Sequence, residues 1–218
     1  MAYIDQANIA CGGHAGDTLS MERTVRLAKA HDVSVGAHPS YPDKVNFGRV
    51  SLNIPPHTLL VELQDQVEKL SAICSNHNIE LQYIKAHGAL YNDSNHDTAL
   101  FKILLTLAVK NKCALMIQSH PDLSGHKQLA ETLGVKLILE GFADRAYENS
   151  GDLKARSEAH AVHSAADIIV QQALSFKNSG GVNSAQGKWL DLPIDSLCVH
   201  GDSPFALNAV KAIHDAFH

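Results

Sequence analysis

Four histidines share one local sequence context. His14, His38, His87 and His200 each follow a short apolar run and precede small or turn-forming residues. This context is typical of a residue at the carboxyl end of a buried strand, where the chain enters a loop. Imidazole titrates near neutral pH and is a common metal ligand. We therefore expect four strand ends to direct imidazoles toward one functional site.

The cysteines give a weaker signal. Cys11, Cys74, Cys113 and Cys198 are far apart and form no Cys-x-x-Cys pair, which argues against zinc ribbons and redox motifs. Cys11 stands close to His14 in a glycine-rich turn. Two interpretations remain open for Cys11, a buried structural thiol and a nucleophile, and we expect the first.

Short apolar runs alternate with segments of helical periodicity. The runs are typical of buried parallel strands, and they cover residues 7–11, 33–37, 81–86, 113–117, 135–139 and 196–199. Apolar residues recur at three- and four-residue steps over 58–76 and again over 100–108, which predicts two amphipathic helices. Ser164 and Asp167 predict a capping box at a further helix start.

This alternation predicts an α/β fold of parallel βα units. A barrel and a doubly wound sheet are both compatible with it. Loops that contain candidate functional residues follow the first, second, third, fifth and last runs. Because these loops are spread along the whole chain, a barrel is favoured. We expect a single domain over residues 1–218, with a flexible loop at 178–184.

Charged groups at other predicted strand ends add candidate binding residues. Arg49 follows a rigid turn and is suited to gripping a carboxylate. Asp144 and Arg145 follow the fifth run, where they either bind a ligand or pair with neighbours to fix the loop. Lys85 has the strand parity of His87 and is expected to point the same way.

Composition excludes several classes of function. Apolar residues make up 45% of the chain, charged residues 19%, and the formal net charge is -5. Because no basic stripe is present, we expect no nucleic-acid partner. No apolar stretch approaches the roughly 20 residues that cross a bilayer, so we expect no membrane span and a cytoplasmic location.

Six motifs together resemble the LamB/YcsF family. They lie in the family's order at residues 8–17, 36–43, 47–49, 85–92, 140–147 and 199–202. The resemblance runs from about residue 5 to the C-terminus. It implies a distorted seven-stranded TIM-like (β/α) barrel of the glycoside hydrolase/deacetylase type. It also implies an enzyme component that works with B and C subunits to open the lactam of 5-oxo-L-proline to L-glutamate with ATP hydrolysis.

The chain departs from the family pattern in three places. The family begins with a strand reading roughly Asp-Leu-Asn-Cys-Asp-x-Gly-Glu, and we expect the first barrel strand to be absent here, so that the domain is N-terminally truncated relative to the family. Gly13 stands where the family usually has phenylalanine, and Ala86 where it has proline. The missing strand would remove carboxylates beside the strand-end histidines.

Opening a lactam suggests roles for these residues. A base must activate water, and the carbonyl oxygen must be made a better electron acceptor. The candidate catalytic residues are His14, His38, His87, His200, Asp202 and Lys85, with either Lys85 or the loop N–H groups stabilising the oxyanion. The candidate substrate-binding residues are Arg49, Asp144, Arg145, Tyr91 and Asn8. If a divalent metal is present, the expected ligands are His14, His38 and His200.

ATP handling has no standard motif in this chain. The segment 181–189 resembles a P-loop but has five residues between its glycines and Trp189 in place of Ser or Thr. We therefore expect ATP to be bound with the partner subunits. Two alternatives stay open, a stand-alone metal-dependent deacetylase or amidohydrolase and a noncatalytic substrate-binding subunit. Homo-oligomerisation is a further option.

Overall fold

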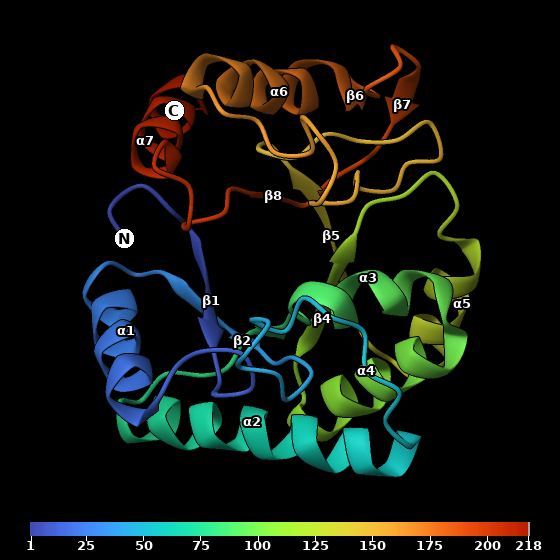
Figure 1. Ribbon diagram of the computed structural model, residues 1–218. Coiled ribbons are helices and arrows are strands. Elements are labelled where there is room, and N and C mark those ends of the chain that lie inside the picture. Colours follow the sequence, from blue (N-terminus) through green and yellow to red (C-terminus); the bar gives the residue numbers. More distant parts are fainter. Residues whose placement is uncertain (218) are drawn as a thin grey trace. The chain divides into compact units, whose positions relative to one another are not determined.

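The computed structural model describes residues 1–217, which divide into two compact units (Figure 1). Unit 1 comprises Met1–Ile117 and Gly125–Leu137, and unit 2 comprises Gln118–Ser124 and the residues from Ile138 onward. Within this part of the chain, no helix combines the length and apolar character needed to cross a membrane.

Unit 1 contains a parallel sheet. Its strands follow the order β1-β2-β3-β4, which is also their order in the sequence. They are β1 (Gln6–Ala10), β2 (Ser34–His38), β3 (Tyr83–Ile84) and β4 (Ala114–Gln118). Each matches a predicted apolar run, although β3 is shorter than its run. The register pairs Ala10 with His38, so adjacent strands reach the same edge together.

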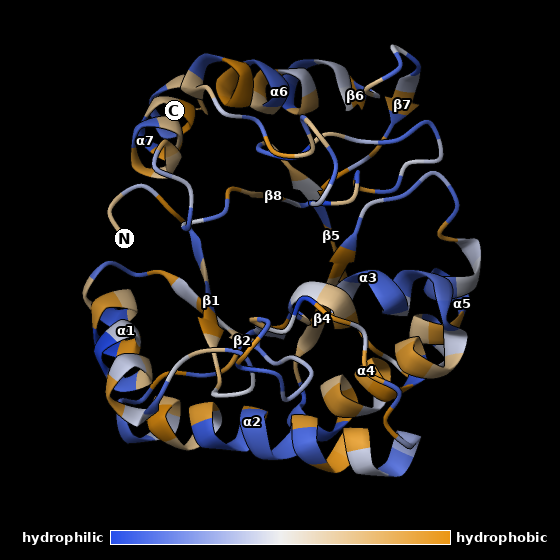
Figure 2. Cartoon of the chain, viewed as in Figure 1, coloured by the Kyte–Doolittle hydropathy of each residue, from blue (hydrophilic) through white to orange (hydrophobic). Residues whose placement is uncertain are grey.

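Four helices lie between the strands of this unit in the sequence, and a fifth follows β4. They are α1 (Thr18–Ala30), α2 (Pro56–Asn76), α3 (Gly88–His96), α4 (Thr98–Asn111) and α5 (Ser124–Thr132). Helix α2 confirms the predicted amphipathic helix, because Leu59, Leu63, Val67 and Leu70 are fully buried. Figure 2 shows that α2 carries both polar and apolar residues along its length. Helix α4 confirms the second prediction.

Helix starts in unit 1 follow their capping residues. The Asp17 carboxylate accepts the backbone N–H of Ser20, and the Ser20 hydroxyl accepts the backbone N–H of Asp17, both at 2.8 Å. This reciprocal capping box begins α1 immediately after the first glycine-rich turn. Asp97 similarly accepts the backbone N–H groups of Ala99 and Leu100 at the start of α4.

Unit 2 contains two strand pairs and two helices. Strand β5 (Leu137–Phe142) pairs in parallel with β8 (Ser196–Cys198), and β6 (Gly181–Asn183) pairs antiparallel with β7 (Trp189–Asp191). Helices α6 (Ala166–Ser179) and α7 (Ala206–Phe217) pack against each other. Their shared core contains the fully buried residues Ala143, Ile169, Ala173 and Ala209.

Two local predictions for unit 2 are wrong. The expected flexible loop at 178–184 contains the end of α6 and the strand β6, because Gly180 adopts a φ of +72° and turns the chain directly into a hairpin. Ser164 and Asp167 form no capping box, since α6 has Ala165 at its N-cap and no side-chain cap hydrogen bond. The P-loop-like segment 181–189 is the β6–β7 hairpin, which differs from the strand–loop–helix of a P-loop.

Candidate functional site

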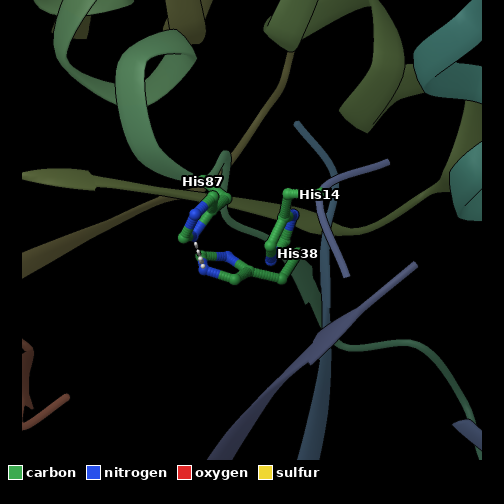
Figure 3. A group of neighbouring side chains, drawn as sticks. All are labelled: His14, His38 and His87. Atoms are coloured by element: carbon green, nitrogen blue, oxygen red, sulfur yellow. Dashed lines mark hydrogen bonds between the residues drawn. The ribbon is translucent and has the colours of Figure 1, made fainter. Parts of the chain in front are cut away.

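Three of the four strand-end histidines come together in unit 1 (Figure 3). His38 is the last residue of β2, His14 lies in the loop after β1, and His87 precedes α3 in the loop after β3. Because the three strands are adjacent and parallel, their carboxyl ends meet at one edge of the sheet. One ring nitrogen from each histidine lies within 4.8 Å of the others.

The three rings pack against one another. His14 and His87 are stacked, with ring centroids 3.7 Å apart and an interplanar angle of 10°. His38 is nearly perpendicular to both, at 88° and 79°. The Phe47 ring makes edge contacts with His14 and His87. An aromatic side chain therefore covers part of a compact group of imidazoles.

A serine fixes the tautomer of His14. The Ser40 hydroxyl donates to the carbonyl oxygen of Tyr41 at 2.8 Å, so its hydrogen is already used. The Ser40 oxygen must then accept the hydrogen bond that joins it to His14 Nδ1, at 3.0 Å. Nδ1 of His14 therefore carries a proton, and in the neutral ring Nε2 carries the lone pair.

Backbone carbonyls fix the other two rings. The Lys85 carbonyl oxygen lies 2.8 Å from His38 Nδ1, and the Phe47 carbonyl oxygen lies 2.9 Å from His87 Nε2. A carbonyl oxygen only accepts, so both of these nitrogens donate. In neutral rings the lone pairs are left on His38 Nε2 and His87 Nδ1, and these two atoms lie 3.0 Å apart.

The surroundings favour the neutral form of all three rings. Burial, and next the charge of Arg49, lower the pKa of His14 to about 4. Burial and the neighbouring His14 lower the pKa of His87 to about 3. Burial, and next the charge of Lys85, hold the pKa of His38 well below its usual range. The cluster thus offers lone pairs at neutral pH, suited to binding a metal ion.

Gln66 supports this cluster from α2. Its side-chain oxygen accepts the Ser40 backbone N–H at 3.0 Å, and its amide donates to the Ser40 carbonyl oxygen at 2.9 Å. Gly13 allows this arrangement, because a Cβ there would lie 2.4 Å from the Gln66 oxygen and 2.7 Å from Ser40 Oγ. Sequence reasoning missed Gln66 and Ser40. A polar residue at a core-facing position of a predicted helix was the available signal for Gln66.

The remaining candidate site residues of unit 1 differ in burial and in their contacts. Lys85 is buried, and its Nζ lies 5.6 Å from the centroid of the buried Tyr91 ring. Arg49 is exposed, with its guanidinium carbon 5.0 Å from the Phe47 ring centroid. Asn8 lies in β1 with an exposed side chain. Lys85 and Arg49 both contribute positive charge at the histidines.

Unit 2 contains the fourth histidine, His200, in a pair with Asp144. The buried Asp144 carboxylate accepts the His200 ring Nδ1–H at 2.9 Å and the His200 backbone N–H at 2.9 Å. Burial opposes ionisation of Asp144, but the hydrogen bonds from His200 and the charge of Arg145 together lower its pKa. Asp202 is exposed in the same loop. The predicted convergence of His200 with the other three histidines stays a prediction.

Arg145 contacts the loop that follows it. Its guanidinium donates to the carbonyl oxygens of Ala161 and Lys154, at 3.2 and 2.6 Å, and the side chain is buried. These bonds correspond to the loop-fixing alternative left open for this residue. A role for Arg145 in substrate binding stays a prediction.

Known proteins resemble the chain over nearly its whole length. The A subunit of 5-oxoprolinase from Chromohalobacter salexigens is 43% identical over 219 residues, covering 100% of this chain and 88% of the relative. The Vibrio vulnificus protein of the same name is 41% identical over 216 residues, covering 99% and 87%. The corresponding protein from Pyrococcus horikoshii is 40% identical over 215 residues, covering 98% and 83%.

A solved structure has the same fold. The crystal structure of a lactam utilization protein from Thermus thermophilus matches with a TM-score of 0.88 and 31% identity, covering 99% of this chain and 85% of that one. This match confirms the predicted α/β fold of the TIM-like barrel type. The sequence profile of the LamB/YcsF family matches residues 1–218. The chain therefore belongs to the LamB/YcsF family.

Proposed function

We propose that this chain is the A component of a 5-oxoprolinase, which opens the lactam of 5-oxo-L-proline to L-glutamate with hydrolysis of ATP. The observation that carries the proposal is the 39–43% identity, over 98–100% of the chain, to proteins named as the A component of 5-oxoprolinase. The match to a lactam utilization protein supports the same class of substrate.

The histidine cluster suits the water-activating step of this reaction. A lactam is a resonance-stabilised amide, so its hydrolysis requires a base that deprotonates water and a group that stabilises the oxyanion. His14, His38 and His87 are unprotonated in this environment, which a base requires, although their lowered pKa values make each of them a weak base. Lys85 is buried close by and would stabilise developing negative charge as a cation.

The Asp144–His200 pair suits a second proton-transfer role. A carboxylate that accepts the Nδ1–H of a histidine fixes the tautomer and leaves the lone pair on Nε2. Asp202, exposed in the same loop, is the alternative acid or base. Arg49 is the candidate for holding the substrate carboxylate, because its guanidinium is exposed and matches a carboxylate in geometry.

ATP and the partner subunits belong to this proposal. The P-loop-like segment is an antiparallel hairpin, so it offers no helix N-terminus to a phosphate. We therefore assign ATP handling to the assembly of this chain with the B and C subunits. The relatives are named as one lettered component of 5-oxoprolinase, which agrees with a multisubunit enzyme.

A coupled assay tests the proposal. The purified chain is incubated with 5-oxo-L-proline and ATP, with and without the B and C subunits, while glutamate and ADP are measured. We expect both products only when the subunits are combined, and no glutamate when ATP is omitted. Glutamate release by the isolated chain without ATP would instead support a stand-alone amidohydrolase. Lactam binding with no turnover in any combination would support a noncatalytic subunit.

A further inference from the structure

We propose that His14, His38 and His87 form a binding site for one divalent transition-metal ion, of the class that prefers imidazole ligands. The inference goes beyond the lactam-opening function and does not depend on it. It places His87 in the metal site, a residue that sequence reasoning had considered only as a catalytic group.

One hydrogen bond holds each of the three imidazole rings. His14 is held through Nδ1 by Ser40, His38 through Nδ1 by the Lys85 carbonyl, and His87 through Nε2 by the Phe47 carbonyl. Protein metal sites commonly hold each ligating histidine in this way, because a bond to the outer nitrogen orients the ring and fixes the tautomer. Three separate acceptors thus leave the lone pair of each neutral ring on the other nitrogen.

The contact between His38 and His87 identifies where an ion would bind. Nε2 of His38 and Nδ1 of His87 lie 3.0 Å apart, and in the neutral rings both atoms carry lone pairs. Two lone pairs repel each other at this distance, so a proton or a metal ion shared by the two nitrogens would stabilise the contact. An added proton is one solution, and it would make the contact a hydrogen bond from an imidazolium. A metal ion bound to both lone pairs is the other.

The distances agree with metal bonds to two of the rings. With metal–nitrogen bonds of about 2.1 Å, ligand atoms 3.0 Å apart subtend about 90° at the ion. Widening that separation to about 3.4 Å gives a tetrahedral angle. The His14 ring stacks on His87 in a nearly parallel plane, so it must tilt out of the stack for its Nε2 to reach the same ion.

The donor set indicates which ions bind. Three neutral nitrogens suit Zn²⁺, Co²⁺ or Ni²⁺, whereas Mg²⁺ and Ca²⁺ prefer oxygen ligands. Among the described residues no carboxylate belongs to this group of ligands, so the ion would keep its full positive charge and would have coordination positions left for water or a substrate oxygen. Three protein ligands with an open position are typical of catalytic zinc sites.

Binding of Co²⁺ and Zn²⁺ to the chelator-treated full chain tests the inference. Isothermal titration calorimetry gives stoichiometry, and the visible absorption of bound Co²⁺ reports imidazole coordination. Substrate, ATP and partner subunits are absent, so the result is independent of the 5-oxoprolinase proposal. We expect one ion per chain, no comparable binding of Mg²⁺, and loss of the Co²⁺ spectrum in His38→Ala and in His87→Ala.

Two further variants separate metal ligation from folding. Ser40→Ala keeps all three imidazoles but removes the acceptor that holds His14, and we expect affinity to fall about 10- to 100-fold. His31→Ala changes an exposed histidine at the end of α1 and should bind like the wild-type chain. Circular dichroism of each metal-free variant checks the fold. Absence of stoichiometric binding in the wild-type chain, or an unchanged Co²⁺ spectrum in folded His38→Ala and His87→Ala, would overturn the inference.

Discussion

The Asp144 carboxylate holds His200 by its side chain and by its backbone at once. It accepts the ring Nδ1–H at 2.9 Å and the backbone N–H at 2.9 Å. The side chain of Asp144 is 1% exposed, while that of His200 is 26% exposed. A buried carboxylate thus fixes the orientation of a partly accessible imidazole, which is the arrangement that proton transfer requires.

Replacing Asp144 with asparagine should destabilise the chain in a pH-dependent way. At pH 7 we expect a loss of roughly 3 kcal/mol in the free energy of unfolding, because the ring N–H and the backbone N–H of His200 lose a charged acceptor. The pKa of Asp144 is lowered by folding, so its stabilising contribution is complete above the ordinary value of 3.8 and disappears as pH falls through the lowered pKa. Urea unfolding of both proteins between pH 7 and pH 3 measures the difference.

Asp191→Asn is the matched control, because Asp191 is exposed in the same unit. It should leave the free energy of unfolding nearly unchanged at every pH. Equal free energies of unfolding for Asp144→Asn and the wild-type chain at pH 7 would contradict the assignment. A difference in the free energy of unfolding that grows below pH 4 would contradict it as well.

Alanine at any of the three clustered histidines should impair lactam opening in the assembled enzyme. We expect turnover to fall by about 10²- to 10⁴-fold for His14→Ala, His38→Ala and His87→Ala, the range found when a proton-transfer group is removed. Steady-state glutamate release measures the effect. His31→Ala should retain wild-type turnover, and wild-type turnover in all three cluster variants would refute a catalytic role.

Gln66→Leu should weaken the support of the histidine cluster indirectly, through Ser40. The change keeps the side-chain size but removes both hydrogen bonds to the Ser40 backbone. Leaving those buried groups unpaired costs about 2 kcal/mol. Because Ser40 holds His14, we also expect weaker Co²⁺ binding. Thermal unfolding and Co²⁺ titration measure the two effects.

Glu62→Leu, on the exposed side of the same helix, is the comparison for Gln66→Leu. It should change neither unfolding nor Co²⁺ binding appreciably. Equal effects of the two substitutions would show that Gln66 acts only through general helix stability.

The sequence predicted the strand ends but not the contacts that support them. Strand-end position is a local pattern, so His14, His38 and His87 could be identified from flanking residues. The Gln66–Ser40 contact joins residues 26 positions apart, and only tertiary packing brings α2 to that loop. The β6–β7 hairpin was missed because Asn, Ser and Gly favour turns and flexible loops equally.

Cys11 should behave as a structural thiol. Its side chain is fully buried and its S–H donates to the Ile9 carbonyl oxygen at 3.0 Å. Burial raises the pKa of Cys11 to about 12, so the reactive thiolate is scarce at pH 8. We expect iodoacetamide to modify Cys11 only after unfolding, as read from peptide masses, and the urea-unfolded chain provides the reactive comparison. Cys11→Ala should keep most of the turnover of the assembled enzyme. Cys11 would instead be identified as a nucleophile by three results together. Iodoacetamide would label it rapidly in the folded chain, turnover would fall in parallel, and added lactam would prevent both effects.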